Sequence, residues 1–194
     1  MSKPDSTGAR KERNKAIRWV VSVFITTIFI SGIISLASEE IMSASSMPVA
    51  FIILLVIVFI GILFDIIGVA VTSADEKPFH SMAARKVPGA LESIRLLRNA
   101  EKVGSICNDV VGDICGVVSG SASATIAAQL LQNFELSWPR LASLVMSALV
   151  AGLTVGGKAI GKSLAIGSCT KIVHFVGLTI HRFQKIGDIF KKRK

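Results

Sequence analysis

Five charged residues interrupt long apolar stretches of the chain, and these are the residues best placed for chemistry: Asp65, Asp109, Asp113, Lys158 and Lys162. An ionisable group inside a membrane helix costs roughly 2.5–3.5 kcal/mol on insertion scales. The last two aspartates are four residues apart, and so are the two lysines, so each pair shares one helix face. Counted from the inner ends of the stretches at about 1.5 Å per residue, all five lie roughly 7–15 Å deep. The sequence therefore predicts one polar cluster in the inner half of a bilayer, formed by three helices.

Two interpretations of this cluster stay open. In the first, the lysines and aspartates form a structural ion-pair network that fixes helix packing. In the second, the carboxylates line a pathway for a cation or a proton, since Mg²⁺ prefers hard oxygen ligands. Asn108, Thr72 and Ser73 add neutral oxygens nearby. The lysines argue against a permanently bound divalent ion, because they can neutralise the carboxylates themselves.

Other chemistry has little support in the sequence. No nucleophile–base pair, Walker loop or HExxH motif occurs, and the glycines and lysine of residues 152–161 lack P-loop spacing. The three histidines, His80, His174 and His181, are dispersed without the spacing of paired metal ligands. We therefore expect no enzyme, no catalytic residue and no cofactor-binding residue. Mg²⁺ is expected only as a bound or transported ion.

Four apolar stretches must position these residues, and each is long enough to cross a membrane: 19–38, 49–73, 103–131 and 141–168. A spanning helix needs roughly 20 mostly apolar residues, and in lipid only a helix satisfies the backbone of such a stretch. The sequence therefore predicts an all-α membrane protein with four transmembrane helices plus interfacial amphipathic helices.

The N-terminal region divides into two parts. Residues 1–16 are polar and charged and are predicted to form a disordered basic cytoplasmic tail. Residues 17–38 are predicted to form an additional N-terminal transmembrane helix. A retained anchor is favoured over a cleaved signal peptide, because the apolar run is longer than the roughly 7–15 residues of a signal sequence.

The distribution of basic residues predicts the orientation of the chain. Of the 22 Lys and Arg, six lie before the first stretch, six in residues 77–102 and seven from residue 171 onward, whereas the first and third connections hold only Arg140. Cytoplasmic loops carry such an excess of Lys and Arg. Both termini are therefore predicted to be cytoplasmic. The net charge of +9 points to anionic lipid headgroups rather than to nucleic acid.

Two amphipathic segments adjoin the spanning stretches. In residues 90–102, Leu91, Ile94 and Leu97 recur among charged residues, which is typical of a helix on the inner surface. The basic segment after Gly167 is predicted to lie in the interface, with packing on the inner connection as the alternative. Glycines at i, i+4 in the third and fourth stretches indicate either close helix packing or a widened helix that lines a site.

Four segments, in order, resemble motifs in the transmembrane domain of the CNNM/CorC family, which is linked to Mg²⁺ efflux: 64–74, 98–102, 109–113 and 157–165. The first is similar to the family's F-S-x-x-E-T-A-L-x-S-A and the last to G-E-x-x-P-K-S-L-A. The chain has Gly68 and Lys158 where these motifs have acidic residues, and the family's regulatory CBS domains are absent from the sequence. The resemblance covers residues 49–190, including the C-terminal amphipathic helix.

This resemblance implies a homodimer in the bacterial-type inner (plasma) membrane that moves or senses Mg²⁺, Co²⁺ or a related divalent cation. It implies metal ligands among the oxygen-bearing side chains of the second and third stretches: Asp65, Asp109, Asp113 and Asn108. A non-transporting membrane scaffold or subunit is the alternative. In that alternative, Lys158 and Lys162 form structural ion pairs with the aspartates.

Overall fold

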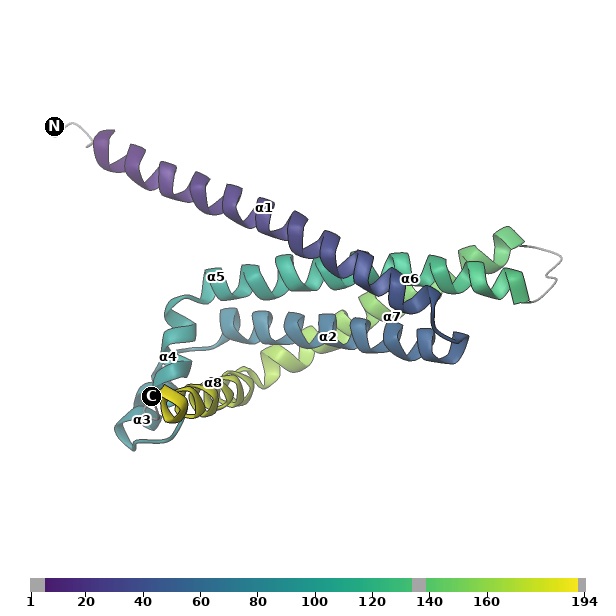
Figure 1. Ribbon diagram of the computed structural model, residues 1–194. Helices are drawn as coiled ribbons and strands as arrows, with labels where there is room; N and C mark the ends of the chain where they lie inside the picture. Colours follow the sequence, from purple (N-terminus) through teal and green to yellow (C-terminus); the bar gives the residue numbers. More distant parts are fainter. Residues whose placement is uncertain (1–5, 134–138, 192–194) are drawn as a thin grey trace.

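The fold is entirely helical over the part of the chain that the computed structural model describes, residues 6–133 and 139–191 (Figure 1). This confirms the predicted all-α class. In chain order the helices are α1 (Ser6–Ser43), α2 (Met47–Ser73), α3 (Lys77–Ala84), α4 (Ala90–Arg98), α5 (Ala100–Ser105), the π-helix η1 (Ile106–Val111), α6 (Gly112–Asn133), α7 (Pro139–Gly167) and α8 (Cys169–Lys191).

Four helical segments are long and apolar enough to cross a membrane: Ile17–Met42, Met47–Ser73, Ala100–Leu131 and Arg140–Gly167. They coincide with the four predicted stretches to within a few residues, and the chain is a multi-pass membrane protein. The third span is continuous through α5, η1 and α6.

The start of α1 differs from the prediction of a disordered tail over residues 1–16. The helix begins at Ser6, while residues 1–5 lie outside the described part. Ala, Arg, Lys and Glu dominate residues 9–15 and are good helix formers. They therefore extend the spanning helix beyond its apolar stretch.

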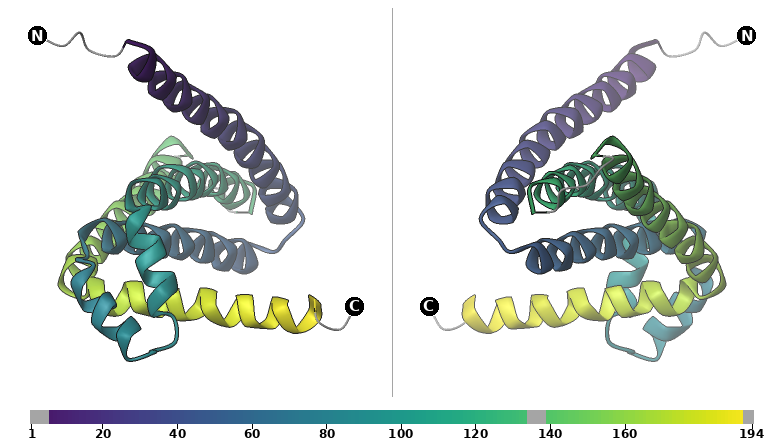
Figure 2. Two further views of the ribbon diagram at one scale, coloured as in Figure 1. Left: turned by 90° about the vertical axis from the view of Figure 1, so that its left-hand side faces the viewer. Right: turned by 90° about the vertical axis from the view of Figure 1, so that its right-hand side faces the viewer.

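The helix α2 is central in the bundle, because α6 and α7 both pack against it. The helix α1 crosses α6 near its own C-terminal end and diverges from the bundle toward its N-terminus (Figures 1 and 2). A core cluster lies near this crossing and includes Met42, Leu54, Val58 and Ile126. None of the most apolar window of α1 is buried, so α1 is attached mainly through its C-terminal part.

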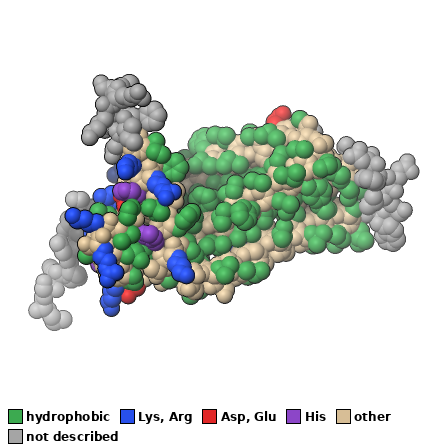
Figure 3. Space-filling view, turned by 90° about the horizontal axis from the view of Figure 1, so that it is seen from below, with side chains coloured by type: hydrophobic (Ala, Val, Ile, Leu, Met, Phe, Trp, Pro, Cys, Tyr) green, Lys and Arg blue, Asp and Glu red, His purple; other side chains and the backbone are tan. Residues whose placement is uncertain are grey.

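The short helices α3 and α4 gather with α8 at one end of the bundle, and α8 runs across that end (Figures 1 and 2). A second core cluster joins them to the end of α2 through Val71, Phe79, Ile94 and Val173. Lys and Arg side chains gather at this end on the face that Figure 3 draws, while hydrophobic side chains cover the spans. The helix α8 packs on α4, which confirms the predicted packing on the inner connection, while its placement in the membrane interface stays a prediction.

Candidate intramembrane polar site

Asp65 lies in the interior of the helix bundle. It retains 7 % of its accessible surface, because α2 is covered by neighbouring helices at this level. Its Oδ2 atom is buried and has no hydrogen-bond partner among the described residues. A buried acceptor left in this way costs about 1–3 kcal/mol, and more when it carries charge. The carboxyl group therefore needs a hydrogen-bond donor, a water molecule or a cation beside it.

Asn108 of η1 provides a second buried acceptor against the same part of α2. Its Oδ1 atom also has no hydrogen-bond partner. The side chain packs directly on Gly68: a Cβ atom there would overlap Asn108 Oδ1 and lie 2.7 Å from Asn108 Cγ. Asp65 and Gly68 are three residues apart and therefore share one face of α2, and Asn108 packs on this face at Gly68. Gly68, where the CNNM/CorC motif has glutamate, makes the room that Asn108 occupies.

The third span changes to a π-helix at Asn108. The π-helix η1 covers Ile106–Val111, and π turns inside α-helices are rare and frequently occur at functional sites. At the end of η1, Lys158 Nζ of α7 donates to the Gly112 carbonyl oxygen at 3.5 Å, which is a long and weak hydrogen bond. The third span is therefore widened at residues 106–111, whereas the glycine series from which a widening was predicted lies in the α-helix that follows.

Close packing of α7 on α2 places Lys158 at this level. A Cβ atom on Gly161 would lie 2.7 Å from Ile66 Cγ1, and one on Gly157 would overlap Ile62 Cδ1. Small residues at i, i+4 allow such close approach between membrane helices. For the fourth stretch, the prediction of close packing is therefore confirmed.

The other predicted charged residues lie on the surface of the spans. Asp109 and Asp113 are exposed, and Ser105 Oγ donates a 2.8 Å hydrogen bond to Asp109. Lys162 is exposed on α7. In the described part of the chain, no ion pair joins an aspartate to Lys158 or Lys162, and no group of three or more His, Cys, Asp and Glu could hold a metal. The predicted meeting of three carboxylates and two lysines is therefore not found there.

The predicted neutral oxygens near the end of α2 are also placed differently. Thr72 Oγ1 donates to the Gly68 carbonyl oxygen at 3.0 Å, so its proton is engaged with the helix backbone. Its Cγ2 atom packs closely on Gly104 of α5. Ser73 is the last residue of α2 and is exposed. The polar layer therefore consists of Asp65 and Asn108, while Lys158 of α7 contacts the Gly112 carbonyl oxygen at the end of η1.

This layer fits a small, hard cation. It presents one carboxylate oxygen and one amide oxygen from different helices, both buried and both without a donor. Mg²⁺ takes carboxylate and amide oxygens and usually keeps several of its waters, so it needs only one or two protein ligands. In such a site Asp65 would supply the negative charge, and Asn108 the neutral oxygen.

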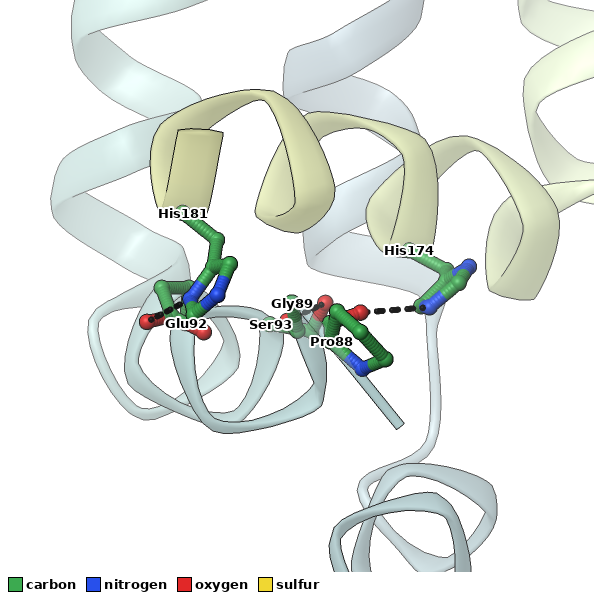
Figure 4. Close-up of polar contacts among 6 residues, drawn as sticks. All are labelled: Pro88, Gly89, Glu92, Ser93, His174 and His181. Atoms are coloured by element: carbon green, nitrogen blue, oxygen red, sulfur yellow. Dashed lines mark hydrogen bonds and ion pairs between the residues drawn. The ribbon is translucent and has the colours of Figure 1, made fainter. Parts of the chain in front are cut away.

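A separate polar cluster joins α8 to α4 at the basic end of the bundle (Figure 4). His181 Nδ1 lies 3.0 Å from Glu92 Oε1, and His174 Nε2 lies 3.2 Å from the Pro88 carbonyl oxygen. Between them, Ser93 Oγ lies 2.9 and 3.2 Å from backbone carbonyl oxygens of the two neighbouring segments. His174 and His181 therefore hold α8 against the α4 region, and the described residues contain no group of three or more His, Cys, Asp and Glu that could hold a metal.

The Glu92 carboxyl group is ionised readily in this cluster. Burial raises its pKa, but the hydrogen bond from His181, the backbone N–H of Glu92 and the positive charges of His181 and Arg95 outweigh that effect. The net result is a pKa below the ordinary value of 4.5. Sequence reasoning misses the pairing of Glu92 with His181, because the two residues lie 89 positions apart in the chain.

No family model matches the chain, and no curated protein or solved structure matches it. The described residues define a class by their fold and site: an all-α, multi-pass membrane protein with buried polar atoms of Asp65 in α2 and Asn108 in η1. Membership of the CNNM/CorC family, which the sequence motifs suggest, stays a prediction.

Proposed function

We propose that the chain binds a Mg²⁺-like divalent cation between α2 and η1 and moves or senses it in the plasma membrane. The observation that carries this proposal is the pair of buried acceptors, Asp65 Oδ2 and Asn108 Oδ1, neither of which has a donor. One cation would satisfy both atoms and remove a cost of about 1–3 kcal/mol for each. The similarity to CNNM/CorC motifs supports the same class of ion and a homodimeric assembly.

The proposed orientation places both termini and the end formed by α3, α4 and α8 in the cytoplasm. The excess of Lys and Arg at this end supports it. Asp65 precedes the inner end of α2, Ser73, by eight residues, or about 12 Å of helix. The cation would therefore bind in the inner half of the bilayer and reach the site from the cytoplasm.

Lys158 acts in this proposal as an internal counter-charge. Its ammonium group lies 3.5 Å from the Gly112 carbonyl oxygen, and Gly157 and Gly161 pack on Ile62 and Ile66, which places Lys158 near the level of Asp65. The positive charge of Lys158 would repel a cation bound at that level. This repulsion weakens cation binding, and a site that must release its ion requires such weakening.

The alternative class is a non-transporting scaffold or subunit in which the Asp and Lys groups are structural ion pairs. The basic end of the bundle would suit a partner or lipid surface in that case. However, the described part of the chain contains no ion pair between these groups. The contact of α7 with α2 depends instead on Gly157 and Gly161.

Metal-dependent unfolding of the purified protein tests the proposal. Mg²⁺ at about 100 times its Kd would stabilise the protein by about 2.7 kcal/mol. We expect this stabilisation in the parent and in Asp109→Asn, which removes an exposed carboxylate as a matched control. We expect none in Asp65→Asn or Asn108→Leu. Equal stabilisation of all four proteins by Mg²⁺, or equal shifts by Mg²⁺ and by Na⁺ at matched ionic strength, would contradict a specific site.

Mg²⁺ flux into proteoliposomes then separates movement from sensing. Transport predicts flux in the parent that Asp65→Asn abolishes, whereas sensing predicts binding without flux. A scaffold predicts neither, and it predicts that Asp65→Asn leaves both measurements unchanged.

A further inference from the structure

A cavity of about 540 Å³ lies where α1 diverges from the bundle. Its walls come from α1, α2 and the η1–α6 segment, and nearly all of them are apolar. They include Trp19, Ile30 and Ile34 of α1, Ile60 of α2, and Ile106 and Ile114 of the third span. Because this part of α1 is otherwise unburied, the cavity forms a gap between a spanning helix and the bundle to which it belongs.

The size of the cavity indicates what fills it. Its walls extend along α1 from Trp19 to Ile34 and along the third span from Ile106 to Val118. These lengths correspond to about 18–22 Å of helix, slightly more than the roughly 15 Å of one leaflet's hydrocarbon. The length of the cavity and its apolar walls suit a single acyl chain.

Basic residues flank one end of the cavity. Arg18 directly precedes Trp19, and Lys102 precedes Ile106 by one helical turn; both basic side chains are exposed. Neither forms an ion pair within the described part of the chain. They lie at the end toward which α1 and α5 diverge, and this is also the end that α3, α4 and α8 occupy (Figure 1).

We propose that this cavity is a binding site for an anionic phospholipid. One acyl chain lies between α1 and the η1–α6 segment, and the headgroup phosphate pairs with Arg18 and Lys102. Trp19 lies at the level of the headgroups, where indole rings are enriched in membrane proteins. The lipid supplies the contact between α1 and the bundle that protein side chains do not make. This site is independent of the proposed cation site.

Fluorescence quenching of Trp19 tests the lipid site. The chain has two tryptophans, and Trp138→Phe leaves Trp19 as the sole indole. The protein is reconstituted in phosphatidylcholine that contains a minor fraction of phosphatidylglycerol brominated near the headgroup end of its acyl chains. The reverse labelling, with a minor fraction of brominated phosphatidylcholine in the same lipid mixture, measures non-selective contact.

We expect Trp19 to prefer the anionic lipid by about 30-fold, the ratio that two basic residues at a lipid surface supply. Arg18→Gln together with Lys102→Gln should abolish the preference. Arg85→Gln together with Lys171→Gln also removes two exposed basic residues, but away from the cavity, and should retain it. Equal quenching by the two lipids in the parent would overturn the proposal. So would an equal effect of the two double variants, which would indicate general surface electrostatics.

Discussion

Gly68→Ala is the substitution that examines the polar layer most closely. The new methyl group would overlap Asn108 Oδ1 and lie 2.7 Å from Asn108 Cγ, both atoms at the end of a side chain. The Asn108 amide therefore rotates away, and the backbone stays in place. The cost falls at the low end of the roughly 1–3 kcal/mol typical of overpacking. A helix gain of about 1 kcal/mol for Ala over Gly offsets it.

The expected result is a variant of nearly parental stability whose Asn108 oxygen no longer packs against Gly68. Stabilisation by Mg²⁺ should be lost although no ligand residue has been replaced. In an Asn108→Ala background the clash is absent, and Gly68→Ala should then stabilise the protein by about 1 kcal/mol. The coupling energy of the double-mutant cycle should therefore be about 1–2 kcal/mol.

The assay is reversible unfolding of the four proteins in one detergent, with and without Mg²⁺. Gly116→Ala is the matched control on the third span, since a Cβ atom there meets nothing within 4 Å. It should leave the Mg²⁺ response unchanged. The same effect of Gly68→Ala in both backgrounds, together with a retained Mg²⁺ response, would refute the packing of Asn108 on Gly68.

Three predictions concern the α4–α8 cluster. The folded-state pKa of Glu92 lies below its ordinary value of 4.5, so ionised Glu92 stabilises the fold above about that pH and loses this effect as the pH falls through its lower folded pKa. Glu92→Gln should therefore flatten the acid limb of a plot of unfolding free energy against pH. An unchanged acid limb would contradict the pairing with His181. Gly177→Ala would place a Cβ atom 2.6 Å from the Gly89 carbonyl oxygen, which belongs to the backbone and cannot rotate away. We expect the free energy of unfolding to fall by about 1–3 kcal/mol and limited proteolysis of α8 to become faster. Unaltered proteolysis would argue against this close approach. Ser93→Ala should lower the free energy of unfolding by about 1 kcal/mol, because the Ser93 hydroxyl group is the donor that two carbonyl oxygens share. An unchanged free energy of unfolding would show that this hydrogen bond does not stabilise the fold.

The spanning helices are predictable from the sequence because a bilayer imposes both length and composition. Few soluble segments resemble Met47–Ser73, which is apolar over 27 residues with Asp65 as its only charged side chain. The π-helix is not predictable in this way. The residue types of Ile106–Val111 do not distinguish a π-helix from an α-helix. The attachment of α8 to α4 likewise depends on Gly89 and Gly177, which meet only in the folded chain.

For the polar layer, the sequence predicts how deep each side chain lies in the membrane, but not which side of its helix faces the neighbouring helices. The sequence predicts Asp65, Asp109 and Asp113 at one level of the membrane, with Asn108 nearby. Neighbouring residues in a helix point about 100° apart, so Asn108 faces α2 while Asp109 is exposed. The apolar sequence around Asp109 and Asp113 does not mark which side of the third span α2 covers. Only the packing of the helices decides that.

The position of a bound divalent ion tests the central claim most directly. Mn²⁺ is a suitable substitute for Mg²⁺, because it prefers the same oxygen ligands and gives an anomalous X-ray signal. Crystals of the full chain grown with Mn²⁺ should show one anomalous peak between α2 and η1, in contact with Asp65 and Asn108 directly or through one water. A peak at Asp109 or Asp113 instead, or no peak at a concentration that stabilises the protein in solution, would contradict the proposed site.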